Sequence, residues 1–515
     1  MISRYFRPIR IAVSFTFLTV IALCFIDVHG LVPSDIIGNI LYFQFMPALM
    51  QGIAIGAVSG AVIIVLGITL VAGRLYCSFL CPLGAFMDLA LGVKPGKKHF
   101  QWKAGRHLSR RLPFRIMRIF FLIAGFIAID FFDPFSIFGR FMAVLVRPPL
   151  GMANNGFSEL LEKIGVYTIP PVNIRYPAWP VTVLVLVYLC VILAMTLKKK
   201  RLYCNSVCPV GTLLGLVARL SFYRVSIDSQ SCSGCRACER VCKAWCIDSR
   251  NYEVDTCRCV GCGDCLSICP AQSIAYRPFW SAPGKPPGSI DGTRRRLTGL
   301  LLVCFLSASR KLMAKITAPL VYVRNRTPVI RHHAITPPGS TGIDHFIDAC
   351  TACYLCVARC PGQVLQPALA PMGKRGLLLP RFDNSKGFCN DTCTSCGEVC
   401  PTGAIRPLTL QEKKKIQVGK AQFIRENCIV VTQKTACGAC SEHCPTKAVS
   451  MVPEQGLLIP SIDTSICVGC GACEYACPSL PHKSIYVEGN PVHLRAENPQ
   501  PRQAVMPESP SDFPF

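Results

Sequence analysis

The sequence predicts an α-helical membrane core joined to small α+β domains. Three observations predict this fold class. First, 51% of the 515 residues are hydrophobic and the mean hydropathy is +0.39, which is too apolar for a soluble protein of this length. Second, the chain has 33 cysteines, and most of them occur in closely spaced motifs. Third, basic residues flank the apolar runs, as they do in membrane proteins.

Four cysteine motifs recur at a constant interval in the C-terminal part of the chain, which indicates an internal repeat. Each motif ends with three residues and then Cys-Pro, the spacing of bacterial [4Fe–4S] ferredoxins. The candidate ligands are Cys350, Cys353, Cys356, Cys360, Cys389, Cys393, Cys396, Cys400, Cys428, Cys437, Cys440, Cys444, Cys467, Cys470, Cys473 and Cys477. In such motifs three thiolates hold one cluster and the fourth binds the neighbouring cluster. The repeat therefore predicts four clusters in an α+β, bacterial-ferredoxin-like domain.

The pairing of these motifs stays open at this stage. Sequential pairing joins the first motif to the second and the third to the fourth, whereas nested pairing joins the first to the fourth and the second to the third. Two first cysteines also depart from the usual spacing. Cys389 lies four residues before Cys393, and Cys428 lies nine residues before Cys437. These two are the least regular of the predicted ligands.

A compact pair of motifs further upstream predicts two more clusters. The candidate ligands are Cys232, Cys235, Cys238, Cys242, Cys259, Cys262, Cys265 and Cys269. The expected partition places Cys269 with the first three cysteines and Cys242 with Cys259, Cys262 and Cys265. Lys243 replaces the usual proline, and Cys246 and Cys257 are alternatives to Cys242 as a ligand. So short a region buries little apolar surface, so we expect it to need its clusters to fold.

Other roles fit the cysteines less well. Structural zinc sites use separated Cys-x2-Cys pairs, and a disulfide scaffold of such densely spaced thiols would allow many near-neighbour pairings. No Cys-x2-Cys-His haem attachment motif occurs. The formal net charge of +26 falls to about +14 when six dianionic clusters are counted. The basic residues lie beside apolar spans rather than on one soluble face, so no nucleic-acid partner is expected.

Apolar runs predict four membrane spans, at residues 11–26, 45–72, 116–132 and 179–197. The positive-inside rule places the N-terminus, the 74–118 loop and the chain after Lys198 in the cytoplasm. The loops at 27–44 and 134–177 are then expected outside. The predicted location is the cytoplasmic (inner) membrane, with several passes.

The second and fourth spans are each followed by the same sequence, Arg-Leu-Tyr-Cys-x3-Cys-Pro-x-Gly. It contains Cys77 and Cys81 in the first copy and Cys204 and Cys208 in the second. The topology places both copies at the cytoplasmic face. Three interpretations remain for these four cysteines: a shared further metal site, a set of redox-active thiols, or two structural turns.

Residues 293–309 begin with Thr-Arg-Arg-Arg-Leu and continue into a short apolar run, the pattern of a twin-arginine export leader or a short signal-anchor-like helix. Export would place the four-motif domain in the periplasm, opposite a cytoplasmic two-cluster domain. The alternative is a membrane-associated helix that leaves both domains inside. The expected divisions are a four-span membrane domain at 1–222, a two-cluster domain at 223–280, a linker and leader at 281–323, a four-cluster domain at 324–487 and a disordered tail at 488–515.

Two known families resemble different parts of this sequence. Residues 1–275 resemble the NapH/MauN-type membrane ferredoxins in their four spans, two Cys-x3-Cys-Pro motifs and two-cluster segment. Residues 294–486 are similar to the NapG/MauM-type ferredoxin proteins in their leader and four [4Fe–4S] motifs. The core also resembles the C-terminal part of the regulator NosR. The resemblance implies a fusion of two partners that oxidises quinol and delivers electrons to a periplasmic redox protein or reductase.

The sequence therefore predicts an electron-transfer protein with six [4Fe–4S] clusters and a possible seventh centre, working between the quinone pool and a periplasmic acceptor. No constellation for acid–base or nucleophilic catalysis occurs, so its enzymatic role would be at most that of a quinol dehydrogenase component. A second hypothesis is an accessory protein for the maturation of another metalloenzyme, without quinol turnover. A third, a membrane regulator, would need soluble sensor domains that the sequence lacks.

Overall fold

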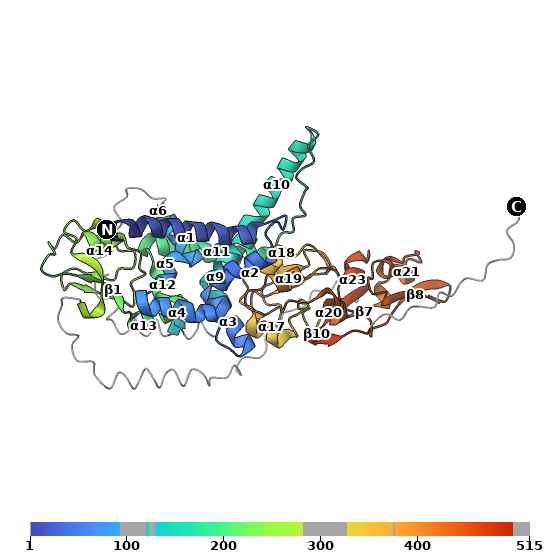
Figure 1. Cartoon of the computed structure of the whole chain (residues 1–515). Coiled ribbons are helices and arrows are strands. Elements are labelled where there is room, and N and C mark those ends of the chain that lie inside the picture. The colour runs from blue at the N-terminus through green and yellow to red at the C-terminus, as the bar shows by residue number, and fades with distance from the viewer. Residues whose placement is uncertain (1, 93–119, 123–128, 282–326, 374–375, 498–515) are drawn as a thin grey trace.

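The computed structural model describes residues 2–92, 120–122, 129–281, 327–373 and 376–497. A helical core formed by residues up to 222 lies between two cysteine-rich parts (Figure 1). We call these the two-motif region, residues 223–281, and the four-motif region, residues 327–497. The predicted export leader, most of the third predicted span and the C-terminal residues 498–515 lie outside the described residues.

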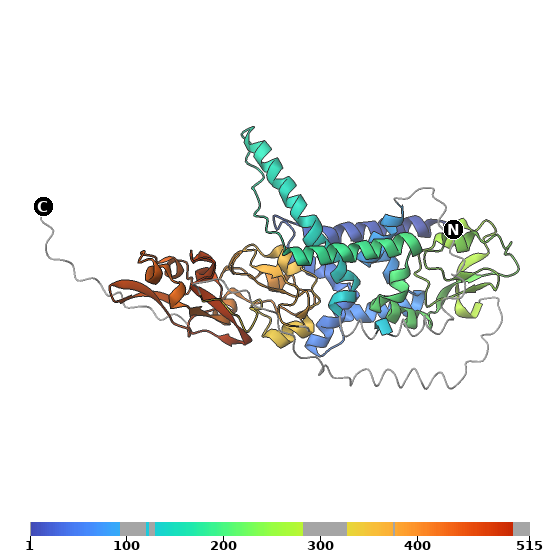
Figure 2. The same cartoon turned by 180° about the vertical axis from the view of Figure 1, so that it is seen from behind.

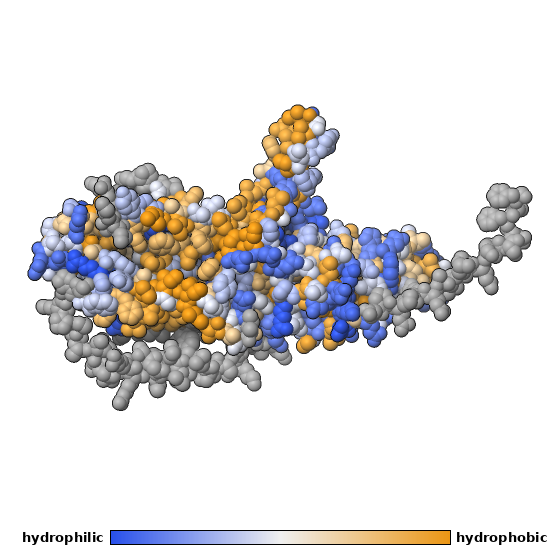
Figure 3. Space-filling model, in the orientation of Figure 1, coloured by the Kyte–Doolittle hydropathy of each residue, from blue (hydrophilic) through white to orange (hydrophobic). Residues whose placement is uncertain are grey.

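Two long helices run through the core and are candidate membrane spans at the positions of the first and fourth predicted spans. They are α1 (Ile2–Ile26) and α11 (Trp179–Lys199). Their apolar stretches of 22 and 21 residues are long enough to cross about 30 Å of hydrocarbon at 1.5 Å per residue. Side chains such as Val183, Val187 and Val191 are exposed on α11. Figure 3 shows that hydrophobic residues cover much of the core in the view of Figure 1, whereas the four-motif region is mostly hydrophilic there. The apolar surface is consistent with membrane association.

The second predicted span, residues 45–72, is wrong as a continuous helix. The chain forms α2 (Ser34–Tyr42), α3 (Phe45–Ile55) and α4 (Gly60–Ala72) instead. Gly56 ends α3 in a left-handed conformation with φ of 74°, which glycine adopts without a steric cost. Helices α2 and α3 are bent by 100° relative to each other and together equal at most one span. The described residues thus contain two to three candidate spans rather than four.

Short helices fill the core around the two long ones. The described set is α5 (Tyr76–Phe79), α6 (Pro82–Gly92), α8 (Ile129–Phe132), α9 (Pro134–Phe141), the π-helix η2 (Met142–Val146), α10 (Arg147–Glu162), α12 (Leu202–Ser206) and α13 (Pro209–Ala218). Helices α6 and α13 each begin at the proline of a Cys-Pro motif, since proline is favoured in the first helical turn. Helix α10 projects away from the core (Figure 2).

The two cysteine-rich regions consist of small helices and two-stranded antiparallel sheets. The two-motif region contains β1 (Tyr223–Ile227), α14 (Ala237–Val241), β2 (Ile247–Asp248), β3 (Glu253–Val254), α15 (Asp264–Ile268), β4 (Ile274–Pro278) and the 3-10 helix η3 (Phe279–Ser281). Strand β1 pairs with β4, and β2 pairs with β3. The paired strands bring the start and the end of the region together.

The four-motif region repeats this design with more elements. Its helices are α17 (Ile343–Ala349), α18 (Leu355–Arg359), α19 (Ser395–Glu398), α20 (Leu410–Lys415), η5 (Arg425–Asn427), α21 (Ile429–Thr432), α22 (Ala439–Glu442) and α23 (Ala472–Ala476). Its strand pairs are β5 (Leu365–Pro367) with β6 (Pro380–Phe382), β7 (Ile416–Phe423) with β10 (Ile485–Arg495), and β8 (Val449–Glu454) with β9 (Leu457–Ile462). Strand β10 continues to Arg495, so the predicted tail from 488 is wrong at its start, because this segment pairs with β7.

The two cysteine-rich regions lie at opposite ends of α1 (Figure 1). Near its N-terminus, the Nε atom of Arg7 lies 3.3 Å from a carboxylate oxygen of Asp264 in the two-motif region. Beyond its C-terminus, Asp27 forms an ion pair of 2.6 Å with Arg359 in the four-motif region. The helical core therefore separates the two sets of cysteine motifs.

Candidate metal centres

The backbone around most cysteine motifs follows one pattern. In four of the six motifs, both neighbours of the second cysteine adopt left-handed conformations. These neighbours are Gly234 and Arg236, Gly261 and Gly263, Ala352 and Tyr354, and Gly469 and Gly471. Such alternation wraps the backbone around the space between three thiols and turns N–H groups toward it, which suits an anionic cluster. The two motifs that begin with the irregular Cys389 and Cys428 lack this loop.

The first motif of the four-motif region pairs with the second. Helix α18 packs against α19. Burial and the thiolates of its own motif raise the pKa of Cys356, and Cys400 of the second motif adds to this increase. Burial and Cys389 of its own motif likewise raise the pKa of Cys396, with Cys360 of the first motif adding to it. The last cysteine of each motif therefore lies beside the first three of the other.

The third and fourth motifs form an equivalent pair, with α22 packed against α23. Burial and the neighbouring Cys437 of the same motif raise the pKa of Cys440 to about 11, and Cys477 of the fourth motif adds to this increase. Burial and two other cysteines of its own motif also raise the pKa of Cys473, and Cys444 of the third motif adds to this increase. The structure thus favours sequential over nested pairing. The two pairs touch where the N–H of Cys389 donates to the carbonyl of Cys470.

The two-motif region gathers its cysteines in the same exchanged manner. Burial, Cys259 and then Cys242 raise the pKa of Cys265, so Cys242 of the first motif lies with the second. The sulfur of Cys246 is 3.6 Å from that of Cys242. A hydrogen bond from the Cys246 thiol lowers the pKa of Cys242. The structure therefore brings Cys246 to this centre, whereas the carbonyl group of Cys257 accepts a hydrogen bond from Arg74.

The two copies of the Cys-x3-Cys-Pro motif meet in one place. Cys77, Cys81, Cys204 and Cys208 are all buried in a single hydrophobic core, and Cys208 is within electrostatic reach of the other three. We call this set the four-cysteine site. Each cysteine pair stands where a short helix ends and a proline begins the next, so the two copies present their thiols in the same local geometry.

Two arginines cross between the copies of this motif. Arg74 of the first copy donates to the carbonyl of Cys204 at 3.0 Å and lies 3.8 Å from the sulfur of Cys77. Arg201 of the second copy donates to the carbonyl of Cys77 at 2.8 Å and lies 3.8 Å from the sulfur of Cys204. The site is therefore built with approximate twofold symmetry from an internal repeat.

The chemistry of the donors fits iron–sulfur clusters better than single ions. None of the 32 described cysteines forms a disulfide. Within the described ranges, no three His, Cys, Asp or Glu side chains converge closely enough to hold one metal ion. A [4Fe–4S] cubane is larger than an ion and takes its four thiolates at separate iron corners. All of the predicted cluster cysteines except the exposed Cys235 are buried or half-buried, which suits thiolates that enclose such a cluster.

The two-motif region packs directly on the four-cysteine site. Ser78 donates to the carbonyl of Val260 at 2.6 Å, and Arg74 donates to the carbonyl of Cys257 at 2.8 Å. Lys243, which replaces the usual proline, bridges Asp88 of the core at 3.2 Å and Asp264 at 3.3 Å. That ion pairing gives a structural reason for the departure from Cys-Pro. Cys242, Cys246 and Cys262 consequently share one buried core with the four-cysteine site.

The opposite side of the core leads to the first motif of the four-motif region. The Tyr203 hydroxyl, next to Cys204, donates to the carbonyl of Phe132 at 2.8 Å, at the end of α8 and just before α9. Near the other end of α9, a Cβ atom on Gly139 would overlap the carbonyl oxygen of Cys353. Helix α9 therefore lies between the four-cysteine site and the first motif, held by a buried Asp133 that caps its N-terminus.

Comparison with known proteins agrees with this chemistry. A 4Fe–4S binding domain model matches residues 54–103 and 181–225, and a 4Fe–4S dicluster domain model matches residues 435–480. The ferredoxin-type protein MauM of methylamine utilization from Methylobacillus flagellatus is 36% identical over 156 residues, which are 28% of this chain and 63% of that relative. MauM of Methylophilus methylotrophus is 34% identical over 165 residues, 30% of this chain and 71% of the relative.

The chain belongs to the ferredoxin-type iron–sulfur proteins. The ferredoxin-type protein NapG of Escherichia coli is also similar, with 29% identity over 156 residues, 28% of this chain and 65% of NapG. No solved structure matches the chain. An electron-transfer role and [4Fe–4S] cofactors follow from this membership. In this ferredoxin-type protein, the 4Fe–4S binding domain model falls on both copies of the Cys-x3-Cys-Pro motif, including all members of the four-cysteine site.

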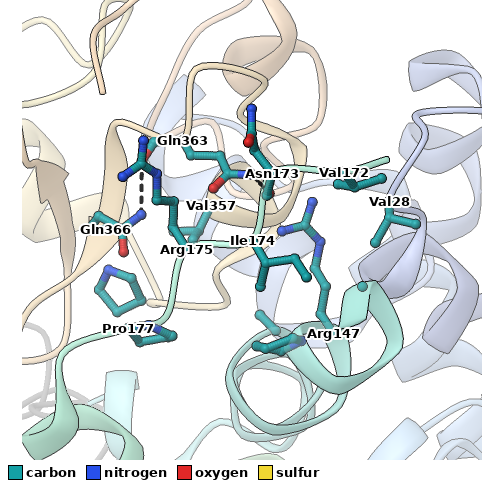
Figure 4. Close-up of a pocket in the computed structure, with 14 residues that line it drawn as sticks. Val28, Arg147, Val172, Asn173, Ile174, Arg175, Pro177, Val357, Gln363 and Gln366 are labelled. Atoms are coloured by element: carbon teal, nitrogen blue, oxygen red, sulfur yellow. Dashed lines mark hydrogen bonds between the residues drawn. The ribbon is translucent and has the colours of Figure 1, made fainter. Parts of the chain in front are cut away.

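A pocket of this ferredoxin-type protein lies between α10, the segment before α11 and the four-motif region (Figure 4). Arg147, Arg175 and Gln363 line it, and no cysteine does. Burial lowers the pKa of Arg147. The pocket marks the joint between the core and the first motif, and it is separate from the thiols.

Sequence reasoning identified the cysteines but missed two further residues at these centres, Arg74 and Arg201. In the sequence, Arg74 and Arg201 counted only as basic residues that help to predict membrane orientation, although each occupies the first position of a repeated motif. Cys246 was predicted as an alternative ligand to Cys242, but the sequence did not show where it lies relative to the other cysteines. The shared first position of the motif was the signal that could have singled out the two arginines.

Proposed function

We propose that this ferredoxin-type protein is a membrane-bound relay that passes electrons between the quinol pool and an acceptor beyond the four-motif region. The observation that carries the proposal is the single-file order of the thiol sets. The two-motif region, the four-cysteine site, α9 and the first motif follow one another along the axis of α1 (Figure 1). A hydrogen bond between the second and fourth motifs then joins the pair formed by the first and second motifs to the pair formed by the third and fourth. A relay needs its centres to follow one another in such an order.

The residues of this chain would hold seven centres. Six are the predicted [4Fe–4S] clusters on the exchanged cysteine sets, and the seventh is the four-cysteine site. When bound, such clusters supply one-electron transfer at potentials set by charge, hydrogen bonds to sulfur and exposure. The chain contributes thiolate ligands, backbone N–H groups in the left-handed loops, and apolar packing that excludes water. We further propose the NapH/MauN-like and NapG/MauM-like fusion, with the two-motif region cytoplasmic and the four-motif region periplasmic.

The relay is tested by adding a short-chain quinol to the purified full-length protein in detergent, without oxygen, and recording the bleaching of the cluster absorbance. We expect the wild-type clusters of both regions to be reduced. The C77S/C204S double variant should show reduction on one side of the four-cysteine site only, because its link is removed. If no quinol reduces any cluster, the relay loses its electron source and an accessory role in metalloenzyme maturation takes its place.

A further inference from the structure

Arg74 is a buried cation beside the four-cysteine site. Its side chain is 1% exposed. It donates to Asn205 and to the carbonyls of Cys257 and Cys204, and among the residues that the structure describes no Asp or Glu pairs with it. Guanidinium stays protonated in proteins, and an uncompensated buried charge is costly. The buried guanidinium of Arg74 therefore requires a negative charge nearby. Among its described neighbours, only cysteine sulfur atoms can carry that charge.

The surroundings of the four-cysteine site carry an excess of positive charge. Four cations there are at most 7% exposed, namely Arg10, Arg74, Lys200 and Arg201. Asp88 pairs with Arg10 at 2.7 Å and with Arg201 at 2.8 Å, and Asp264 lies 3.7 Å from Arg10. Lys200 donates only to backbone carbonyls. Lys243 and Arg7 also pair with these two carboxylates, so in the described part of the chain the cations around the site outnumber the carboxylates that face them.

The two arginines touch the site in matching ways. Each lies 3.8 Å from the sulfur of the first cysteine in its own motif and bonds the carbonyl of the equivalent cysteine in the other. Reduction of an iron–sulfur centre adds one negative charge. A cation held at this distance in a buried setting favours the reduced form more than the oxidised form, because charge interactions there are weakly screened.

We propose that Arg74 and Arg201 are positioning residues that neutralise the centre of the four-cysteine site and raise its reduction potential. The inference rests on the proposed relay, since it assumes that this site holds an iron–sulfur centre. A raised potential at this point makes the site an electron sink between the two regions. Arg74 is the cleaner target of the two, because Arg201 also pairs with Asp88.

The test is a redox titration of the full-length protein followed by electron paramagnetic resonance, together with iron and sulfide analysis. The signal of the four-cysteine site is defined as the one that disappears in C77S/C204S. We compare R74Q, which removes the charge, with R74K, which keeps it, and with R425Q, a surface change in the four-motif region. R74Q should lower the midpoint so that the one-electron equilibrium constant changes at least tenfold, which is 59 mV. R74K and R425Q should stay near wild type.

Each outcome decides the proposal. A shift in R74Q that R74K largely restores supports it, as does loss of the centre in R74Q but not in R74K. An unchanged midpoint in R74Q overturns the role of Arg74 and leaves the relay intact. Equal effects of R74Q and R74K, on either midpoint or iron content, show that packing rather than charge matters and also overturn it. If C77S/C204S removes no iron and no signal, the four-cysteine site holds no centre and the relay itself fails.

Discussion

The backbone N–H of Cys389 donates a hydrogen bond of 2.9 Å to the carbonyl oxygen of Cys470. These residues belong to the second and fourth motifs, which lie far apart in the sequence. A further bond of 3.1 Å between Val418 and Val468 supports the same junction. The irregular first cysteine of the second motif is therefore anchored at the boundary between the two pairs of motifs.

Sequential pairing makes a distinct prediction for the last cysteine of each motif. C360S should damage the centre formed with Cys389, Cys393 and Cys396, whereas C400S should damage the one formed with the first motif. Each variant is expected to lose roughly one cluster, about four iron atoms per chain. Mössbauer or paramagnetic resonance difference spectra should group C360S with C396S and C400S with C356S. Grouping of C360S with changes in the fourth motif would establish nested pairing instead.

The junction between α9 and the first motif can be tested at Gly139. In G139A the new methyl group would overlap the Cys353 carbonyl and lie 2.7 Å from the ring of Phe25. Overpacking of this kind costs about 1–3 kcal/mol. We expect a lower unfolding temperature and slower electron transfer from the core to the four-motif region.

Gly156 provides the matched control for that change, because it is also a helical glycine but a Cβ atom there meets nothing within 4 Å. G156A should leave electron transfer unchanged and alter stability by up to about 1 kcal/mol in the favourable direction. Similar losses in G139A and G156A would argue against a close contact between α9 and Cys353.

The stability of the fold depends on pH through His493, which lies in strand β10. Burial lowers the pKa of this imidazole to about 4, and the Nε2 atom lies 2.8 Å from the Thr336 hydroxyl. An unfolded histidine has a pKa of about 6.5. The neutral ring therefore stabilises the fold fully above pH 6.5, and this contribution is lost as the pH falls from 6.5 toward 4.

At pH 5.5 the expected loss is about 1 kcal/mol. Thermal unfolding of wild type and H493N, followed by circular dichroism between pH 7.5 and 5.5, measures it. H493N should be less stable at pH 7.5 but should show a flatter pH dependence than wild type. An equal slope in the two proteins would mean that His493 does not cause the effect.

Cys246 gives a prediction about ligand replacement. Its sulfur is 3.6 Å from that of Cys242, so either thiol can reach the same corner of a cluster. We expect C242S to keep most of its iron at this centre through Cys246, C246S to keep it through Cys242, and the double variant to lose about four iron atoms per chain. Full loss in C242S alone would show that Cys246 acts only as a hydrogen-bond donor.

Much of the candidate site was predictable because ligand spacing is a local property. The cysteine triplets with two residues between ligands form the same left-handed loops in four of the six motifs, as Gly469 and Gly471 illustrate. Helix α11 was predictable because its apolar run is continuous. The second predicted span was not, since Gly56 ends a helix only when the following chain turns back, and hydropathy does not record that turn.

The sequence by itself determined the chemistry: the number of thiol sets, the apolar helices, and the repeated Arg-Leu-Tyr-Cys motif. Only the tertiary structure decided which sets are neighbours. Spacing constrains atoms within a few residues, whereas the pairing of Cys360 with the second motif depends on long-range packing. The same holds for Arg74, which lies against both Cys77 and Cys204. Its charge was visible in the sequence, but its burial beside two cysteines from distant copies of one motif was not.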